Sequence, residues 1–175
     1  MSVEDNSDVL QSAMEPRPND MFTYQCSVHI DAPPERVFDI VGDLGRSADW
    51  AGSGQVRSVA GDTDAPVGVG TKYIAQEKIV VPFKSESVIV AYQPNRFIAW
   101  TSRPLGPSVP LHRWAFQLEP ENGGTRLTHE VRVARYTGFT RLVQMVMGRL
   151  SGGTEPLMHG MEQTLANVKA RAESR

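Results

Sequence analysis

Apolar and polar residues alternate along much of the chain. The first alternating segment places five apolar side chains on one face: Phe22, Tyr24, Cys26, Val28 and Ile30. A period of two is typical of a β-strand that is buried on one face only. Six more such segments follow, separated by clusters of Gly, Ser and Asp, at residues 55–60, 70–80, 83–92, 96–102, 109–118 and 125–134. Because most of them follow one another in hairpin order, the pattern predicts a seven-stranded antiparallel sheet.

Other segments carry apolar residues at helical spacing. Residues 34–50 predict two short helices directly after the first strand, and residues 138–150 predict a third helix. After Ser151-Gly152-Gly153 the chain predicts a helix of roughly 20 residues, which spans about 30 Å. Its apolar stripe consists of Leu157, Met161, Leu165, Val168 and Ala172.

A sheet with one apolar face has to cover that face, and only the last helix is long enough to do so. The sequence therefore predicts an α+β fold, in which a curved seven-stranded antiparallel sheet wraps around a long C-terminal helix. One predicted strand face mixes small and polar residues with large apolar ones: Phe83, Ser85, Ser87, Ile89, Ala91, Phe97, Ala99 and Thr101. Because the smaller side chains leave space between sheet and helix, we expect a hollow there.

The composition fits one globular domain that needs no disulfide or metal, since 40% of the 175 residues are apolar and Cys26 is the single cysteine. The 20 acidic and 18 basic residues nearly cancel, so we expect no nucleic-acid partner. Neither a transmembrane stretch nor a signal peptide is recognisable, and we expect a cytoplasmic protein. Residues 1–20 are acidic and lack periodicity. We expect them to form a disordered acidic tail before a ligand-binding domain at residues 21–175.

Several segments follow one another in a characteristic order: Ile30-Asp-Ala-Pro-Pro-Glu-Arg-Val-Phe-Asp-Ile-Val-Gly-Asp-Leu44, Trp50, Val69-Gly-Thr71, Pro94-Asn-Arg-Phe97, Gly124-Thr-Arg-Leu-Thr128 and Leu165-Ala-Asn-Val-Lys169. Together they resemble the START-like (SRPBCC) superfamily, in particular its polyketide cyclase/dehydrase and lipid-transport group. The resemblance implies a helix-grip fold with a cavity between sheet and last helix, which relatives use to hold sterols, lipids, quinones or polyketides. It supplies no shared catalytic motif, so catalysis stays open.

Two histidines are the first candidates for chemistry in this cavity. A register that pairs Phe116 with Leu127 places Trp114 opposite His129 and turns both His129 and His112 toward the apolar face. Burial there lowers the pKa of an imidazole, which then serves as a neutral base or as a hydrogen-bonding group for a ligand. The alternative is a histidine whose hydrogen bonds are satisfied by a neighbour or a buried water molecule.

Glu77 and Tyr73 share one face of the third predicted strand, which would bring an acid and a phenol to the same cavity. A glutamate on such a strand also commonly faces water, and we prefer that interpretation for Glu77. The residues expected to contact a ligand are Tyr73, Glu77, Phe83, Ser85, Ile89, Phe97, Ala99, His112, Trp114, Phe116, Leu127, His129, Met161 and Leu165.

We expect neither a metal nor a cofactor. Cys26 and His29 point to opposite faces of one strand, and His159 falls on the polar side of the last helix. The Gly68-Val-Gly70 segment precedes a strand and lacks the third glycine of a dinucleotide-binding loop.

The segment 131–154 contains Arg132, Arg135, Arg141 and Arg149 but no acidic residue. A basic, methionine-rich amphipathic helix of this kind is typical of a transient contact with an anionic membrane or ligand, here through residues 135–150. The alternative is a lid that packs on the sheet with its arginines in water.

These features predict a carrier or sensor that binds a small hydrophobic or amphipathic molecule of lipid, polyketide or quinone type. A cyclase- or dehydratase-like enzyme that moves protons through His112 or His129 is the alternative. An interaction module with a vestigial cavity is a third hypothesis. The sequence indicates no oligomeric state.

Overall fold

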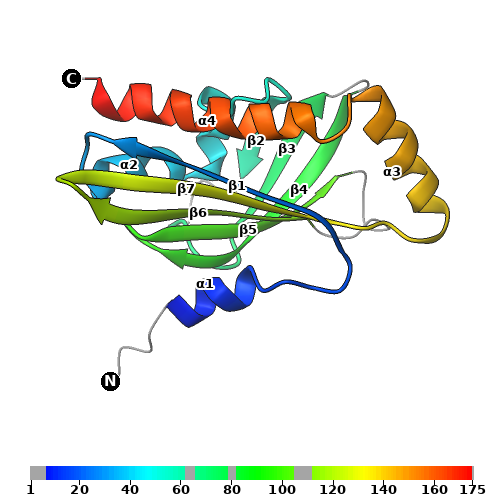
Figure 1. Cartoon of the computed structure of the whole chain (residues 1–175), viewed down its shortest axis with the longest axis horizontal. Helices are drawn as coiled ribbons and strands as arrows, with labels where there is room; N and C mark the ends of the chain where they lie inside the picture. Colours follow the sequence, from blue (N-terminus) through cyan, green and yellow to red (C-terminus); the bar gives the residue numbers. More distant parts are fainter. Residues whose placement is uncertain (1–6, 62–65, 79–81, 105–111, 175) are drawn as a thin grey trace.

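A curved antiparallel sheet forms the centre of the structure, a computed structural model that describes residues 7–61, 66–78, 82–104 and 112–174 (Figure 1). Its seven strands lie in the order β1-β7-β6-β5-β4-β3-β2. Their bounds are β1 (Asp20–Ile30), β2 (Val56–Gly61), β3 (Lys72–Lys78), β4 (Pro82–Gln93), β5 (Phe97–Pro104), β6 (His112–Glu121) and β7 (Gly124–Ala134). The predicted antiparallel sheet is confirmed. The predicted strand ends at residues 79–80 and 109–111 lie outside the described residues.

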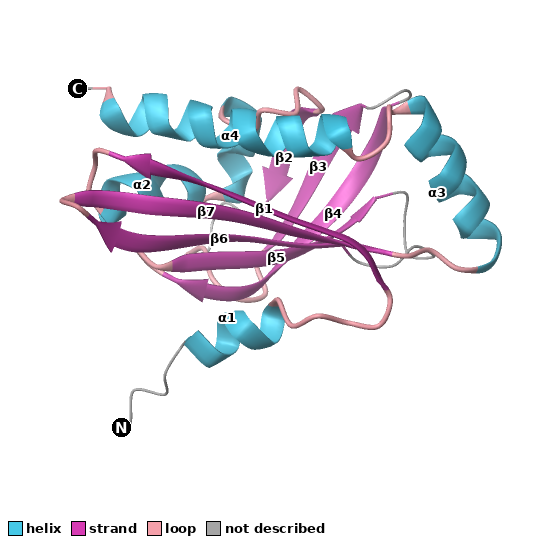
Figure 2. Cartoon of the chain, in the orientation of Figure 1, coloured by secondary structure: helices cyan, strands magenta, loops and turns pink. Residues whose placement is uncertain are grey.

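The long helix α4 (Glu155–Glu173) covers one face of this sheet, called here the inner face (Figure 2). It packs against β1 and against the short helix α2 (Pro34–Val41), which precedes the 3₁₀ helix η1 (Leu44–Asp49). The buried core between sheet and helices includes Phe116 and Val168, both without exposed surface. This arrangement confirms the predicted α+β helix-grip fold. Within the described ranges, no helix is long and apolar enough to cross a membrane.

From Ser7 on, the N-terminal segment differs from the disordered tail predicted for residues 1–20, whereas residues 1–6 lie outside the described residues. Residues from Ser7 to Ala13 form helix α1, which contacts β4 and β5 on the outer face of the sheet (Figure 1). Met14 is buried there together with Phe97, Ala99 and Ala115. The acidic composition of residues 1–20 gives no indication of this contact, because only a few apolar side chains make it, and they pack on Phe97 and alanines of the sheet. A domain boundary at residue 21 stays a prediction.

Arg113 fixes the segment between α1 and β1. Only 2% of its side chain is exposed, and one guanidinium nitrogen lies 2.6 Å from both carboxylate oxygens of Asp20. The other terminal nitrogen donates to the main-chain carbonyl of Glu15 at 2.5 Å. Since a buried guanidinium is costly without an anionic partner, Asp20 and Arg113 depend on each other.

The hairpin of β6 and β7 has a different register from the predicted one. Asn122 and Gly123, both with positive φ, form a two-residue turn between Glu121 and Gly124. The sequence analysis allowed a longer loop and paired Phe116 with Leu127. The tight turn shifts the partners by two residues, so that Phe116 lies opposite His129 instead. Because a shift of two preserves the faces, both histidines still point toward the inner face.

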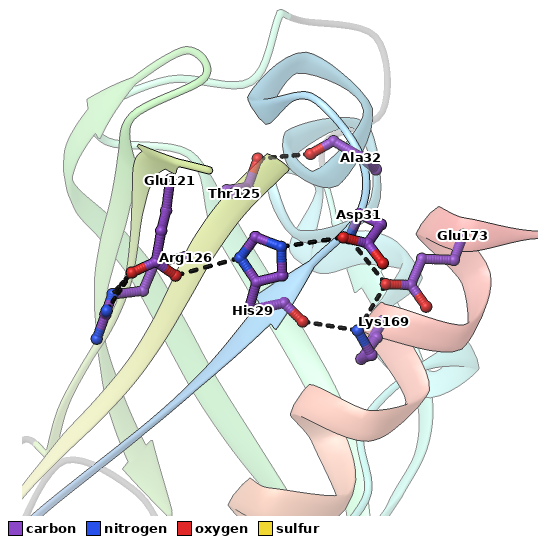
Figure 3. A network of polar contacts seen from close by, with 8 residues as sticks. All are labelled: His29, Asp31, Ala32, Glu121, Thr125, Arg126, Lys169 and Glu173. Carbon is purple, nitrogen blue, oxygen red and sulfur yellow. Dashed lines mark hydrogen bonds and ion pairs between the residues drawn. The ribbon is translucent and has the colours of Figure 1, made fainter. Parts of the chain in front are cut away.

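Polar contacts join the C-terminal half of α4 to the end of β1 (Figure 3). The ammonium group of Lys169 donates to the main-chain carbonyl of His29 at 2.7 Å and to the carboxylate of Glu173 at 2.6 Å. Glu173 in turn accepts from the main-chain N–H of Asp31 at 2.8 Å. The imidazole of His29 also lies 3.1 Å from a carboxylate oxygen of Glu121. These contacts lie at the C-terminal end of α4, whereas α3, which lines the cavity, lies at the opposite end of the molecule (Figure 1).

Candidate ligand-binding site

A cavity of about 1090 Å³ lies between the inner face of the sheet and the helices α3 (Gly138–Leu150) and α4. It occupies only part of the space under α4, because α2 and the buried side chains around it fill the rest. Eight of the residues predicted to contact a ligand line this cavity: Tyr73, Glu77, Phe83, Ser85, His112, Trp114, His129 and Met161.

Four other predicted contact residues point to the inner side but belong to the solid core. Ile89, Phe116, Leu127 and Leu165 are at most 3% exposed and pack with the α2 side chains, and they are not among the lining residues. The sequence pattern identifies their face correctly. It does not show that α2 fills part of the space between sheet and α4.

The prediction is wrong for Phe97 and Ala99, because they lie on the outer face of the sheet, under α1. In β5 the side chains of the inner face are Trp100 and Ser102, both of which line the cavity. Because α1 covers the outer face of β5, this strand carries apolar residues on both faces. Its sequence pattern therefore does not show which residues point toward the cavity. Ala91 also faces outward, after an irregularity between Ile89 and Ala91 in the pairing of β4 with β5.

His129 lies at the inner wall of the cavity among aromatic rings. Its imidazole stacks on Phe116 with 4.3 Å between ring centroids, and Trp114 and Trp100 lie at 5.9 Å and 6.4 Å. Neither ring nitrogen has a hydrogen-bond partner among the described residues. Burial lowers the pKa of His129 to about 3, and a main-chain contact with Met161, which lies outside standard hydrogen-bond geometry, opposes this shift. The ring is therefore neutral and offers one donor and one acceptor.

His112 has partners, in contrast to His129. Its Nδ1 accepts from the main-chain N–H of Ala134 at 3.2 Å, and its Nε2 lies 3.2 Å from the hydroxyl oxygen of Tyr136. Burial lowers the pKa of His112 to about 4, so the ring is neutral. Because Nδ1 accepts, the proton is on Nε2 and is donated to Tyr136. The alternative of a satisfied histidine thus holds for His112.

Tyr136 was missed by the sequence analysis. It lines the cavity, and burial raises the pKa of its phenol to about 12. Since its oxygen accepts from His112, its own proton is free to point elsewhere, including toward a ligand. Tyr136 has this role because it follows β7 and lies close to His112, the first residue of β6. No sequence motif indicates it.

Glu77 is half-buried on the cavity side of β3, which corrects the preferred interpretation that it faces water. Strand β2 pairs with β3 here, with Val56 opposite Glu77. Burial raises the pKa of Glu77, and the hydroxyl of Ser85 opposes this shift. Near the start of β3, the Tyr73 hydroxyl donates to a carboxylate oxygen of Asp43 at 3.3 Å. An acid and a phenol therefore both reach the cavity wall.

Two stacked tryptophans form a flat part of the cavity wall. Trp100 and Trp114 stack with 6.3 Å between ring centroids and 8° between their planes. The indole N–H of Trp114 donates to the hydroxyl of Ser102 at 2.9 Å. Aromatic faces of this kind favour planar or hydrocarbon ligands. No group of three or more His, Cys, Asp or Glu side chains able to hold a metal ion occurs in the described part of the chain.

A family model described as "Polyketide cyclase / dehydrase and lipid transport" matches residues 21–173. Among curated proteins, the uncharacterized protein Rv0088 of Mycobacterium tuberculosis is 35% identical over 94 residues, which cover 53% of this chain and 39% of that protein. This chain therefore matches less than half the length of that relative.

Solved structures of similar fold include an ARO/CYC protein and an aromatase/cyclase. The di-domain ARO/CYC StfQ from the steffimycin biosynthetic pathway superposes with a TM-score of 0.69 at 13% identity, covering 90% of this chain and 52% of that one. The Zhui aromatase/cyclase from Streptomyces sp. R1128 has a TM-score of 0.62 at 18% identity, with coverages of 87% and 93%. Identities this low show a shared fold. The family model, however, covers most of the sequence, and the chain belongs to the polyketide cyclase/dehydrase and lipid-transport family.

Proposed function

We propose that the protein binds a small hydrophobic or amphipathic molecule in the cavity and serves as its carrier or sensor. The observation that carries this proposal is a cavity of about 1090 Å³ with aromatic walls and one buried, unpartnered imidazole. A volume of this order fits a molecule of drug or lipid size. Family membership supports hydrophobic ligand binding in general.

The wall also indicates what the ligand carries. Leaving a buried polar group without a partner costs about 1–3 kcal/mol, and a ligand that supplies the partner recovers this free energy. We infer that the ligand has a planar or hydrocarbon body against Trp100 and Trp114, and a hydroxyl or carbonyl group at His129. Glu77 and Tyr136 are further polar positions for an oxygenated ligand of polyketide or quinone type.

Cavity-filling variants test this proposal with an apolar fluorescent probe, 1-anilinonaphthalene-8-sulfonate. Ser87 lines the cavity, and Ser87→Trp should reduce probe affinity at least tenfold while the protein stays folded. Glu86 is the next residue of β4, is exposed and points to the outer face, which makes Glu86→Trp the matched control. Equal probe affinity in the two folded variants would place probe binding outside the cavity and overturn the proposal.

A cyclase- or dehydratase-like activity is the second candidate, because His129 is neutral and positioned to exchange a proton with a ligand. The names of StfQ and Zhui support the same chemistry in this fold. We place it second because no side chain among the described residues forms a hydrogen bond with the His129 ring. Turnover of a polyketide-like substrate that falls about 10²- to 10⁴-fold in His129→Gln, at unchanged affinity, would favour the enzyme.

A further inference from the structure

Helix α3 exposes its apolar face to solvent. Phe139 is 80% exposed and Leu150 is 62% exposed, and Leu142 and Val146 on the same face are also largely exposed. None of the helix residues is buried. Figure 1 shows α3 projecting beyond the end of the sheet. The exposed apolar stripe of α3 therefore does not pack on the sheet.

Polar contacts hold the opposite face of α3 toward the protein. The side-chain amide of Gln144 donates to the main-chain carbonyl of Ala134 at 3.0 Å, and its oxygen accepts from the main-chain N–H of Tyr136 at 2.9 Å. Val143 and Met147 also line the cavity, so α3 has apolar side chains on its outer as well as its inner side. A helix of a globular protein normally turns a polar face to water. An exposed apolar face of this kind indicates a surface that is covered during function.

The charges beside this face indicate what covers it. Arg135, Arg141 and Arg149 are exposed, and the segment 131–154 contains no acidic residue that could neutralise them. Apolar side chains flanked by arginines match the two layers of an anionic bilayer surface, in which acyl chains lie beneath negatively charged headgroups.

The position of α3 relates this surface to the cavity. Met147 and Gly148 on its inner side line the cavity, as do Gly152 and Gly153 directly after it, both with positive φ. Arg141 and Arg149 also belong to the lining. A bilayer that covers the exposed face would therefore lie beside the cavity wall that α3 forms.

We propose that α3 is a membrane-docking helix, which holds the protein on anionic bilayers through Phe139, Leu142, Val146 and Leu150 and through the neighbouring arginines. The ligand then exchanges between bilayer and cavity beside α3. The exchange rests on the proposed function, whereas the docking does not require a ligand.

Sedimentation with vesicles tests the docking directly. We expect the full chain to bind vesicles of phosphatidylglycerol and phosphatidylcholine, and to bind pure phosphatidylcholine at least tenfold more weakly. The double variant Phe139→Glu, Val146→Glu should lose at least tenfold in binding to the anionic vesicles. Ile74 is a 49% exposed apolar residue on β3, and Ile74→Glu is the control that should bind normally. The double variant should keep the thermal unfolding midpoint, because its replaced side chains are exposed, whereas Ile74→Glu should lower the midpoint slightly, because Ile74 lies opposite Glu86 on β4.

Two further results separate docking from its alternatives. Ser87→Trp should bind vesicles normally even though its cavity is filled, so that failure of the ligand proposal leaves the docking result standing. If the unsubstituted chain ignores anionic vesicles, or if the double variant binds them normally, the docking proposal is overturned. A dimer that Phe139→Glu, Val146→Glu converts to a monomer, without vesicle binding by either protein, would overturn it in favour of self-association.

Discussion

The imidazole of His129 lies over the phenyl ring of Phe116, with 4.3 Å between the ring centroids and 25° between the planes. The two residues are directly opposite each other on β7 and β6. Stacking covers one ring face with apolar surface and leaves the two ring nitrogens, at the ring edge, without partners among the described residues. The protein thus holds a neutral hydrogen-bonding group in an apolar site, at a cost to its own stability.

Replacement of His129 by Phe should stabilise the ligand-free protein by about 1–3 kcal/mol, because it removes buried polar atoms that have no partners. The same variant should bind hydroxyanthraquinone at least tenfold more weakly and bind anthracene unchanged. Chemical denaturation and fluorescence titration measure the two effects. A destabilised variant that binds both probes normally would mean that His129 is already satisfied within the protein.

The buried histidines should make stability fall with pH below about 6.5. Burial lowers the pKa of His129 to about 3 and that of His112 to about 4, from 6.5 for the free side chain. Between these values only the unfolded chain binds the protons, so acid favours unfolding by up to about 1.4 kcal/mol per pH unit for each histidine.

Denaturation curves between pH 7 and pH 5 measure this dependence, and His129→Phe should lose the part that belongs to His129. The raised pKa of Glu77 acts in the opposite direction but is common to both proteins, so it cancels in the comparison. Parallel curves for the two proteins would show that His129 is accessible to protons in the folded state.

Asp20→Asn should destabilise the protein by about 3 kcal/mol, because it leaves the guanidinium of Arg113 buried without a negative partner. Asp8 is exposed on α1, and Asp8→Asn is the matched control that should have little effect. A shift of the unfolding midpoint equal to that of the control would mean that the N-terminal segment is not held by this ion pair.

Ala99→Trp should destabilise the fold by about 1–3 kcal/mol without reducing probe binding in the cavity. The reason is that Ala99 is fully buried on the outer face, where α1 and Met14 leave no room for an indole. Thermal unfolding and titration with the apolar probe distinguish the outcomes. A stable variant that no longer binds the probe would place Ala99 on the cavity side instead.

The sequence predicts the fold well where one face of an element is buried and the other is in water. Strand β1 and helix α4 are of this kind, since the apolar residues of each lie on one face. Strand β5 is not, because Phe97, Ile98 and Ala99 are buried in succession. Its outer face is buried by α1, a helix in the N-terminal segment, whose acidic composition gives no indication of packing. The error in Phe97 and Ala99 and the error in the N-terminal tail therefore have one cause.

The candidate site could be predicted only in part for similar reasons. His129, Trp114 and Met161 were found because they share apolar faces that period and helical spacing reveal. Tyr136 lies outside any regular element, and its contact with His112 depends on the path of the chain after β7. The part of the space that α2 fills likewise depends on packing, which alternation along a strand does not encode.

Native mass spectrometry of the protein purified from its own host tests the central claim most directly, because it weighs any molecule that the cavity retains. The account predicts an adduct of a few hundred daltons on the unsubstituted chain and on Glu86→Trp, the exposed control on β4, in the range of drug-sized ligands. Ser87→Trp, with its cavity filled, should carry no adduct. An unsubstituted chain that is free of any adduct and also fails to bind apolar probes, or an adduct that Ser87→Trp retains in full, would contradict ligand binding in this cavity.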